Sequence, residues 1–268
     1  MMRLSQVFLT LLLLAVSVLL SDSSSAAATS NLVAIYTFTN NSVTDLSGNE
    51  NHGISRTSSV ASGVDPIGTP DGAAVFSRTT PNPLPLIQLP NAVAPSGYQS
   101  WSVSAFFRRW TGAGGGGHWW SIFANGSPNF ELYWFSGSTL VVETMIKTLT
   151  FELIIPTTSP ENEDWLHINI VRNGVDITVV INGTRTRRLA KAVPLETFPS
   201  ISGNSVWMGN DQDSQGGGFS LGNGHVGDIA QLQVVHGPTT SADHERYATF
   251  ARLGNSVTLA AHYPLANG

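Results

Sequence analysis

The sequence predicts an all-β protein, built as a two-sheet antiparallel β-sandwich with its strands in a jelly-roll arrangement. Three observations predict this class. Short segments of alternating or continuously apolar residues recur along the chain, turn-forming residues separate them, and a single segment is typical of a helix. The low charged fraction of 12% and the 26 glycines also suit a chain of strands and turns.

Each expected strand is a short apolar or alternating run that turn residues bound on both sides. Residues 101–108 are the plainest example, because every second residue from Trp101 to Phe107 is apolar and these side chains share one face. The expected strands are 32–38, 73–76, 87–89, 101–108, 119–124, 130–135, 140–145, 150–155, 166–171, 177–181, 206–209 and 228–235.

The clearest hairpin joins 166–171 to 177–181 through Asn173-Gly174. Asn-Gly between two alternating runs is a strong hairpin signal, because both residues accept the positive φ angles of a tight turn. Residues 240–253 form the one helix-like segment, with Ser241 placed to cap its N-terminus.

The N-terminal end of the chain is expected to lie outside this sandwich, and two interpretations are open for the C-terminal end. Residues 1–28 are typical of a secretory signal peptide, with Arg3, an apolar run at 7–20 and small residues before the cleavage site, and so predict a secreted protein without a membrane span. The sandwich domain is expected over 29–255. Residues 256–268 are either its last strand or the start of a truncated second repeat, because 259–268 shares Leu, Ala, Tyr and Asn in register with 32–41.

Composition excludes several classes of protein. The chain has no cysteine, which rules out a disulfide scaffold, thiol chemistry and cysteine-based zinc sites. Its formal net charge of −5 gives no electrostatic reason to expect a nucleic-acid partner.

Several segments in order resemble one known family. They are Tyr36-x-Phe38 followed by Asp45-x-Ser-Gly-Asn-x-x-His-Gly53, then 100–106, then the Trp-x-His hairpin at 165–174, and the closing strand at 227–235. Together they resemble the laminin-G-like domains of the concanavalin A-like lectin and glucanase superfamily, over about residues 32–252. The chain departs from that pattern in loops at 81–90 and 114–117, and therefore in the places where that family carries its specificity.

The polar loop after the first strand is a candidate calcium site. Asp45, Asn49 and Asn51 offer the carboxylate and amide oxygens that calcium prefers, and the resemblance implies that Asp228, before the closing strand, lies near enough to join them. The alternative is that Asp45, Ser47 and Asn49 only cap turns through their own backbone.

Aromatic side chains are the candidate ligand-binding residues. Trp119, Trp120, Tyr133 and Trp134 lie close together in the sequence, and flat rings can stack on the apolar faces of sugars. Trp119 or Trp120, beside a glycine-rich loop, is expected to be the most exposed. The alternative for each ring is a place in the core.

No catalytic pattern is present, and we predict that the protein is not an enzyme. The acidic run at 161–164 lacks the carboxylate spacing of the glucanases, and Glu131, Glu143 and Glu152 are expected to be isolated, solvated strand residues. No nucleophile elbow and no zinc-protease motif occurs.

Two further motifs concern the surface. Asn40, Asn125 and Asn182 each begin an N-glycosylation tripeptide at an expected turn. The basic run Arg185-Thr-Arg-Arg188 predicts either an exposed strand edge guarded by charge or a patch for sulfated glycans.

These patterns favour a secreted, non-catalytic recognition module. Its expected partner is a glycan or a glycosylated extracellular protein, and calcium is its one expected cofactor. A structural or adhesion module that binds protein is the alternative, and a glycoside hydrolase is a more distant one, since a fold alone does not determine function.

Overall fold

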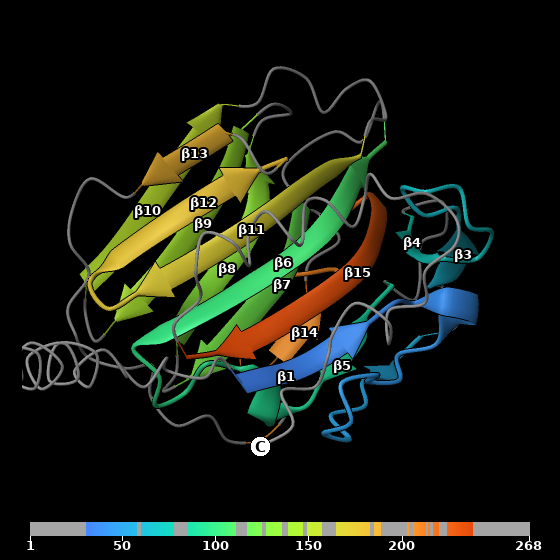
Figure 1. Ribbon diagram of the computed structural model, residues 1–268, viewed down its shortest axis with the longest axis horizontal. Coiled ribbons are helices and arrows are strands. Elements are labelled where there is room, and N and C mark those ends of the chain that lie inside the picture. The colour runs from blue at the N-terminus through green and yellow to red at the C-terminus, as the bar shows by residue number, and fades with distance from the viewer. Residues whose placement is uncertain are drawn as a thin grey trace, which may run out of the picture.

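Figure 1 shows the protein as a computed structural model. It describes residues 31–57, 60–77, 85–110, 117–124, 127–135, 139–146, 149–156, 165–182, 185–188, 203, 206–212, 214, 217–219 and 224–237. These residues form β-strands and two short 3-10 turns, η1 (Thr39–Asn41) and η2 (Asn91–Val93). Within them, no helix is long and apolar enough to cross a membrane.

One layer is an antiparallel sheet of eight strands, which we call sheet A. Its order is β13-β12-β11-β6-β15-β4-β3, and β1 also pairs with β15. Its strands are β1 (Asn31–Tyr36), β3 (Ala61–Gly63), β4 (Ala73–Phe76), β6 (Ser100–Arg109), β11 (Leu166–Asn173), β12 (Asp176–Ile181), β13 (Arg185–Arg188) and β15 (Gly227–His236).

The other layer is an antiparallel sheet of seven strands, sheet B, in the order β10-β9-β8-β7-β14-β5-β2. Its strands are β2 (Ile54–Ser55), β5 (Ile87–Leu89), β7 (Gly117–Ala124), β8 (Ser127–Phe135), β9 (Thr139–Ile146), β10 (Leu149–Pro156) and β14 (Val206–Met208). In Figure 1 sheet A lies in front of sheet B, so the predicted two-sheet sandwich is confirmed.

The hairpin expected at Asn173-Gly174 is also confirmed, with one difference in the turn. Asn173 pairs with Asp176, so the two loop residues are Gly174 and Val175. Gly174 takes a φ of 60°. A glycine at the first loop position is typical of a type II′ turn, which suits the twist of the flanking strands.

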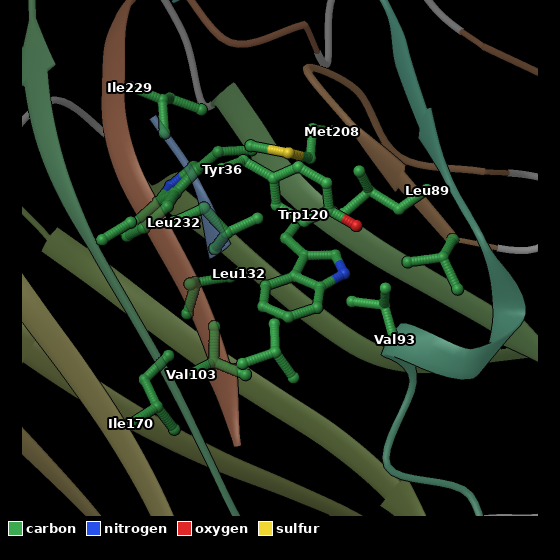
Figure 2. Packing of buried hydrophobic residues seen from close by; sticks show 14 of the residues in the cluster. Tyr36, Leu89, Val93, Val103, Trp120, Leu132, Ile170, Met208, Ile229 and Leu232 are labelled. Atoms are coloured by element: carbon green, nitrogen blue, oxygen red, sulfur yellow. The ribbon is translucent and has the colours of Figure 1, made fainter. Parts of the chain in front are cut away.

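The core fills the space between the two sheets. Alternate residues of β6 from Trp101 to Phe107 enter it, as the sequence predicts. Figure 2 shows the indole of Trp120 from sheet B among side chains such as Val93 and Leu132, with Tyr36 of β1 above it. Burying aromatic side chains of this size is a main source of the stability of such a fold.

A register shift in β15 changes which residues face the core. The alternation predicts that Ala230, Leu232 and Val234 share one face, but the pairing with β6 shifts between Ala230 and Gln233, and Gln231 takes a φ of 52°. Leu232 and Val234 therefore face the core, while Ala230 packs with Phe106 and Ala73 in a separate small cluster. Phe106 alternates with the core residues of β6, so this cluster lies on the outer face of sheet A.

The expected arrangement of the chain ends lies outside the described residues. This concerns the signal peptide at 1–28, the helix at 240–253, the segment 256–268 and the outer limits of the 29–255 domain. All four stay predictions.

Candidate functional site

Four polar and aromatic side chains meet on the outer face of sheet A, where β6 ends and β15 begins, on the side of β3 and β4 in Figure 1. Nε of Arg108 donates to Oδ2 of Asp228 at 2.7 Å, and Nε1 of Trp110 donates to the same oxygen at 2.8 Å. The guanidinium carbon of Arg108 lies 4.9 Å from the centroid of the Trp165 ring. We call Arg108, Trp110, Trp165 and Asp228 the Arg108 cluster.

Strand register brings this cluster together. Arg108 of β6 is the direct partner of Asp228 of β15, and opposite charges at such positions attract one another. On the other side of β6, Leu166 of β11 pairs with Phe107, so Trp165 precedes β11 at the level of Arg108. Three segments that are far apart in the sequence therefore supply one site.

The members of the cluster differ in burial. The side chain of Asp228 is 1% exposed, whereas that of Arg108 is 27% exposed. Trp110 and Trp165 are half-buried, and Trp165 rests on the small cluster of Ala73, Phe106 and Ala230. The buried carboxylate holds the guanidinium in place, and what reaches the surface is a cation beside two indole rings.

The sequence pattern did not single out these two tryptophans. Trp110 lies a few residues before the aromatic candidates at 119–134, and Trp165 carries only the hairpin resemblance at 165–174. One signal was available, because Phe106, Arg108 and Trp110 alternate and therefore share a face. Their partner Asp228 could be found only from the register of β15 on β6.

The expectation that Trp119 or Trp120 is exposed is wrong. The two residues are 1% and 2% exposed, and both belong to the core cluster. The pairing of β7 with β8 shifts between His118 and Trp120, so Trp119 is the extra residue of a β-bulge. The bulge allows two consecutive indoles to enter the core, where Trp119 packs on Phe107 with ring centroids 3.3 Å apart.

Of the other two candidate rings, Tyr133 is half-buried on the outer face of sheet B, where its hydroxyl lies 3.4 Å from Oε2 of Glu143. The backbone of Trp134 lies in β8, but its side chain is outside the described residues. Tyr133 lies on sheet B and the Arg108 cluster on sheet A, so the structure does not bring Tyr133 to the cluster.

The glutamates of sheet B are not isolated, contrary to expectation. Glu131 of β8 pairs directly with Glu143 of β9, which in turn pairs with Glu152 of β10. Glu131 is also buried, with 8% of its surface exposed, rather than solvated. The sequence could not show this, because strand register alone determines which residues stand opposite one another.

We call the candidate calcium loop, residues 42–53, the Asp45 loop. Both carboxylate oxygens of Asp45 accept hydrogen bonds from the protein. Oδ1 of Asp45 accepts from the N–H groups of Ile35 and Ser47, at 2.9 and 2.8 Å. Its Oδ2 accepts from the hydroxyl of Ser47 at 2.8 Å and from the N–H of Asn51 at 3.0 Å. The backbone N–H of Asp45 donates to Nδ1 of His52.

The asparagines of this loop donate hydrogen bonds through their side-chain nitrogens. Nδ2 of Asn49 donates to the carbonyl of Leu32 at 2.7 Å, and Nδ2 of Asn51 donates to that of Val33 at 2.9 Å. This arrangement supports turn stabilisation as the role of the loop. Calcium at Asp45, Asn49 and Asn51 stays a prediction, and no group of three acidic, His or Cys side chains suited to a metal occurs in the described part of the chain.

Asp228, the expected fourth calcium ligand, has different neighbours. Its carboxylate accepts hydrogen bonds from Arg108 and Trp110, whereas the donors to the Asp45 carboxylate lie in β1 and in the Asp45 loop itself. The structure therefore does not join Asp228 to the other three candidate ligands.

The electrostatics of the Asp45 loop follow from these contacts. Burial alone would raise the pKa of the Asp45 carboxyl, but hydrogen bonds from Ile35, Ser47 and Asn51 outweigh burial and the pKa is lowered. Burial, with a smaller contribution from the charge of Asp45, raises the pKa of Tyr36, whose hydroxyl donates to the carbonyl of Asn51.

Two of the three glycosylation candidates are described. Asn40 and Asn182 are exposed and lie at turns, with φ angles of 54° and 50°. Oδ1 of Asn182 accepts a hydrogen bond from the backbone N–H of His167 at 2.8 Å. Nδ2 of Asn182, the atom to which a glycan would be attached, takes no part in this bond. Asn125 lies outside the described residues.

Comparison with known families places the chain. Residues 85–243, more than half of its length, match the laminin-G-like family model described as the concanavalin A-like lectin/glucanases superfamily. The chain belongs to this superfamily. The matched span includes Arg108, Trp110, Trp165 and Asp228 but not the Asp45 loop. No curated protein matches the sequence.

Solved structures of similar fold are distant in sequence. The binding domain of Paraclostridial Mosquitocidal Protein 1 has a TM-score of 0.62 at 17% identity, over 82% of this chain and 52% of that one. The binding domain of botulinum neurotoxin DC, in complex with rat synaptotagmin II, has a TM-score of 0.60 at 12% identity, over 83% and 52%. Domain 4 of AbnA, an extracellular arabinanase of Geobacillus stearothermophilus, in complex with arabinotriose, has a TM-score of 0.56 at 20% identity, over 82% and 98%.

These likenesses show a shared fold. The chain spans about half the length of the two toxin binding domains and nearly all of the arabinanase domain. Two of the three structures are toxin binding domains, and the third is an arabinanase domain that was solved with a bound oligosaccharide.

Proposed function

We propose that the protein is a secreted, non-catalytic recognition module that binds a glycan, free or attached to an extracellular protein, through the Arg108 cluster. The observation that carries this proposal is that Trp110 and Trp165 are half-buried around a guanidinium that Asp228 fixes from below.

The chemistry of the cluster suits a sugar. A sugar ring has apolar C–H faces and a polar rim of hydroxyls, so its site needs flat apolar contacts next to a few fixed polar groups. Indole rings give large, rigid contact surfaces with little loss of conformational entropy. The guanidinium adds planar hydrogen-bond donors in a fixed orientation.

A non-catalytic role is supported by the number of carboxylates in the cluster. Glycoside hydrolysis uses a pair of carboxyl groups on either side of the scissile bond, whereas the Arg108 cluster holds only Asp228, whose Oδ2 already accepts two hydrogen bonds. Incubation with polysaccharides should therefore release no reducing sugar. Release that disappears in a Glu131→Gln variant would instead assign hydrolysis to the glutamates of sheet B.

The decisive experiment is a glycan array probed with the wild-type protein, a Trp165→Leu variant and a Tyr133→Leu control. Trp165 and Tyr133 are both half-buried aromatic residues, on opposite sheets. We expect Trp165→Leu to weaken glycan binding by about tenfold or more, as loss of an aromatic anchor does, and the control to bind normally. Equal binding by all three proteins would refute the assignment to this site.

Protein recognition is the second candidate, because the similar neurotoxin domain was solved with a protein partner. The two candidates differ in one measurement, namely binding to cells before and after enzymatic removal of surface glycans. Loss of binding supports glycan recognition, and unchanged binding supports a protein-binding adhesion module.

Secretion rests on the signal-peptide pattern of residues 1–28. Expression of the full chain in cultured cells should deliver it to the medium with a new N-terminus close to residue 29. A protein retained in the cytosol with its first 28 residues in place would refute this part of the proposal.

A further inference from the structure

We propose that Arg108 makes the site selective for acidic sugars, and that its ligand carries a carboxylate on the sugar ring. This inference rests on the proposed function and names the class of glycan that the Arg108 cluster takes. It depends on how the guanidinium is held and on which of its nitrogens remain for a ligand.

The guanidinium is fixed through one corner. The hydrogen bond and ion pair to Asp228 both use Nε, and the plane of the group lies near the ring of Trp165. The terminal edge, formed by the two Nη groups, makes no hydrogen bond or ion pair with the part of the chain that the structure describes. With 27% of the Arg108 side chain exposed, part of this side chain is open to a ligand.

Two parallel N–H groups on one planar edge match the two oxygens of a carboxylate. Such a paired contact is stronger and more directional than a bond from a single donor. Because Asp228 and Trp165 already restrict the side chain, little further conformational entropy is lost when a ligand binds.

The charge of Asp228 does not cancel this preference. Its Oδ2 accepts from the Nε corner of the guanidinium, and its Oδ1 is buried. A ligand carboxylate at hydrogen-bonding distance from the Nη groups lies closer to the cation than to the Asp228 anion, and Coulomb attraction falls with distance.

The rings of Trp110 and Trp165 restrict the ligand further. A small free carboxylate would use only the Nη edge and leave both rings exposed. A sugar acid can place its carboxylate on Arg108 and an apolar ring face on an indole at the same time, and so gains from both contacts.

The test is calorimetric titration with three oligosaccharides of the same length: tetragalacturonate, its carboxyl-reduced neutral counterpart and a 6-O-sulfated galactotetraose. The proteins are the wild type, Arg108→Lys and the matched control Arg56→Lys. Lysine keeps a cation for Asp228 but lacks the paired donors. Arg56 bonds to the side-chain oxygen of Gln88 on sheet B, away from the site.

We expect the wild type and Arg56→Lys to prefer the galacturonate over the neutral oligosaccharide by about tenfold or more. Arg108→Lys should lose this preference while its thermal midpoint stays close to that of the wild type. If the variant unfolds, the comparison of acidic and neutral oligosaccharides on the wild type still tests the inference.

Four results would overturn the inference. Equal or tighter wild-type binding of the neutral oligosaccharide would remove the acid preference and leave the proposed function standing. An unchanged preference in Arg108→Lys would assign the selectivity elsewhere. If the sulfated galactotetraose binds as tightly as tetragalacturonate, the site recognises charge alone. Failure of the array to show any glycan ligand would refute both the inference and the proposed function.

Discussion

Two buried aspartates, Asp45 and Asp228, serve different purposes in this molecule. Asp45 is 5% exposed and accepts four hydrogen bonds, all from β1 or from its own loop. Asp228 is also buried, but Arg108 comes from β6 and Trp110 from the residue that follows β6, and both are partly exposed.

The difference shows that the surroundings of a carboxylate matter more than the local sequence pattern. The Asp45 loop has the composition of a metal site, yet both oxygens of Asp45 already accept hydrogen bonds from the protein. Asp228 stands in an ordinary alternating strand, yet it holds a cation with donors left for a ligand. Four predictions test this contrast, from the largest expected effect to the smallest.

Replacement of Asp45 by alanine should cost the most stability. The change leaves the N–H groups of Ile35, Ser47 and Asn51 without their acceptor, and unsatisfied buried donors are expensive. We expect the free energy of unfolding to fall by about 4 kcal/mol, measured by urea denaturation. A loss below about 1 kcal/mol would mean that water replaces the carboxylate and that the loop is not structural.

Replacement of Asp228 by asparagine should lower the free energy of unfolding by less than Asp45→Ala does, and it should also weaken glycan binding. Arg108 is already partly exposed and can reach water, so we expect a loss of about 2 kcal/mol in the same assay. Glycan affinity should fall as well, because the guanidinium is no longer held in place. If the variant is destabilised but binds as tightly as the wild type, positioning by Asp228 is refuted.

Acid should weaken the Asp45 loop in a defined direction. The pKa of Asp45 is lower in the folded protein than in the unfolded chain, so its stabilising contribution is present above about pH 4 and is lost as the pH falls through the folded pKa. We expect the stability difference between the wild type and Asp45→Asn to shrink between about pH 4 and pH 2. A difference that stays constant over this range would contradict the assignment.

Calcium should have the smallest effect. Since protein donors occupy both oxygens of Asp45, we expect the thermal midpoint to be the same in millimolar calcium and in excess chelator. A ligand that binds only the folded state must raise the midpoint, so a clear rise that Asp45→Ala abolishes would restore the calcium site.

Local pattern predicted the fold and much of its detail. Alternation located strands such as 101–108 and 166–171, and Asn173-Gly174 located a hairpin, because both signals act between near neighbours in the chain. The basic run at 185–188 predicts either a strand edge or a patch for sulfated glycans, and the run lies on β13, at one end of the strand order of sheet A.

The candidate site could not be predicted in the same way, because it depends on register between distant strands. Bulges at Trp119 and near Gln231 change which side chains face the core, and no local signal marks them. The pairing of Arg108 with Asp228 joins residues 120 positions apart in the chain. Local sequence patterns therefore indicate the indoles of Trp119 and Trp120 as ligand-binding candidates, but not those of Trp110 and Trp165.

The Asp45 loop also affects how the protein behaves among its own copies. One side of β1 pairs with β15, and on the other side the carbonyls of Leu32, Val33 and Ile35 and the N–H of Ile35 are bonded to the loop. An open strand edge is a template on which another chain can add a strand and begin to aggregate. By occupying those groups, the loop blocks strand addition at this margin, so damage to it would expose a surface prone to self-association.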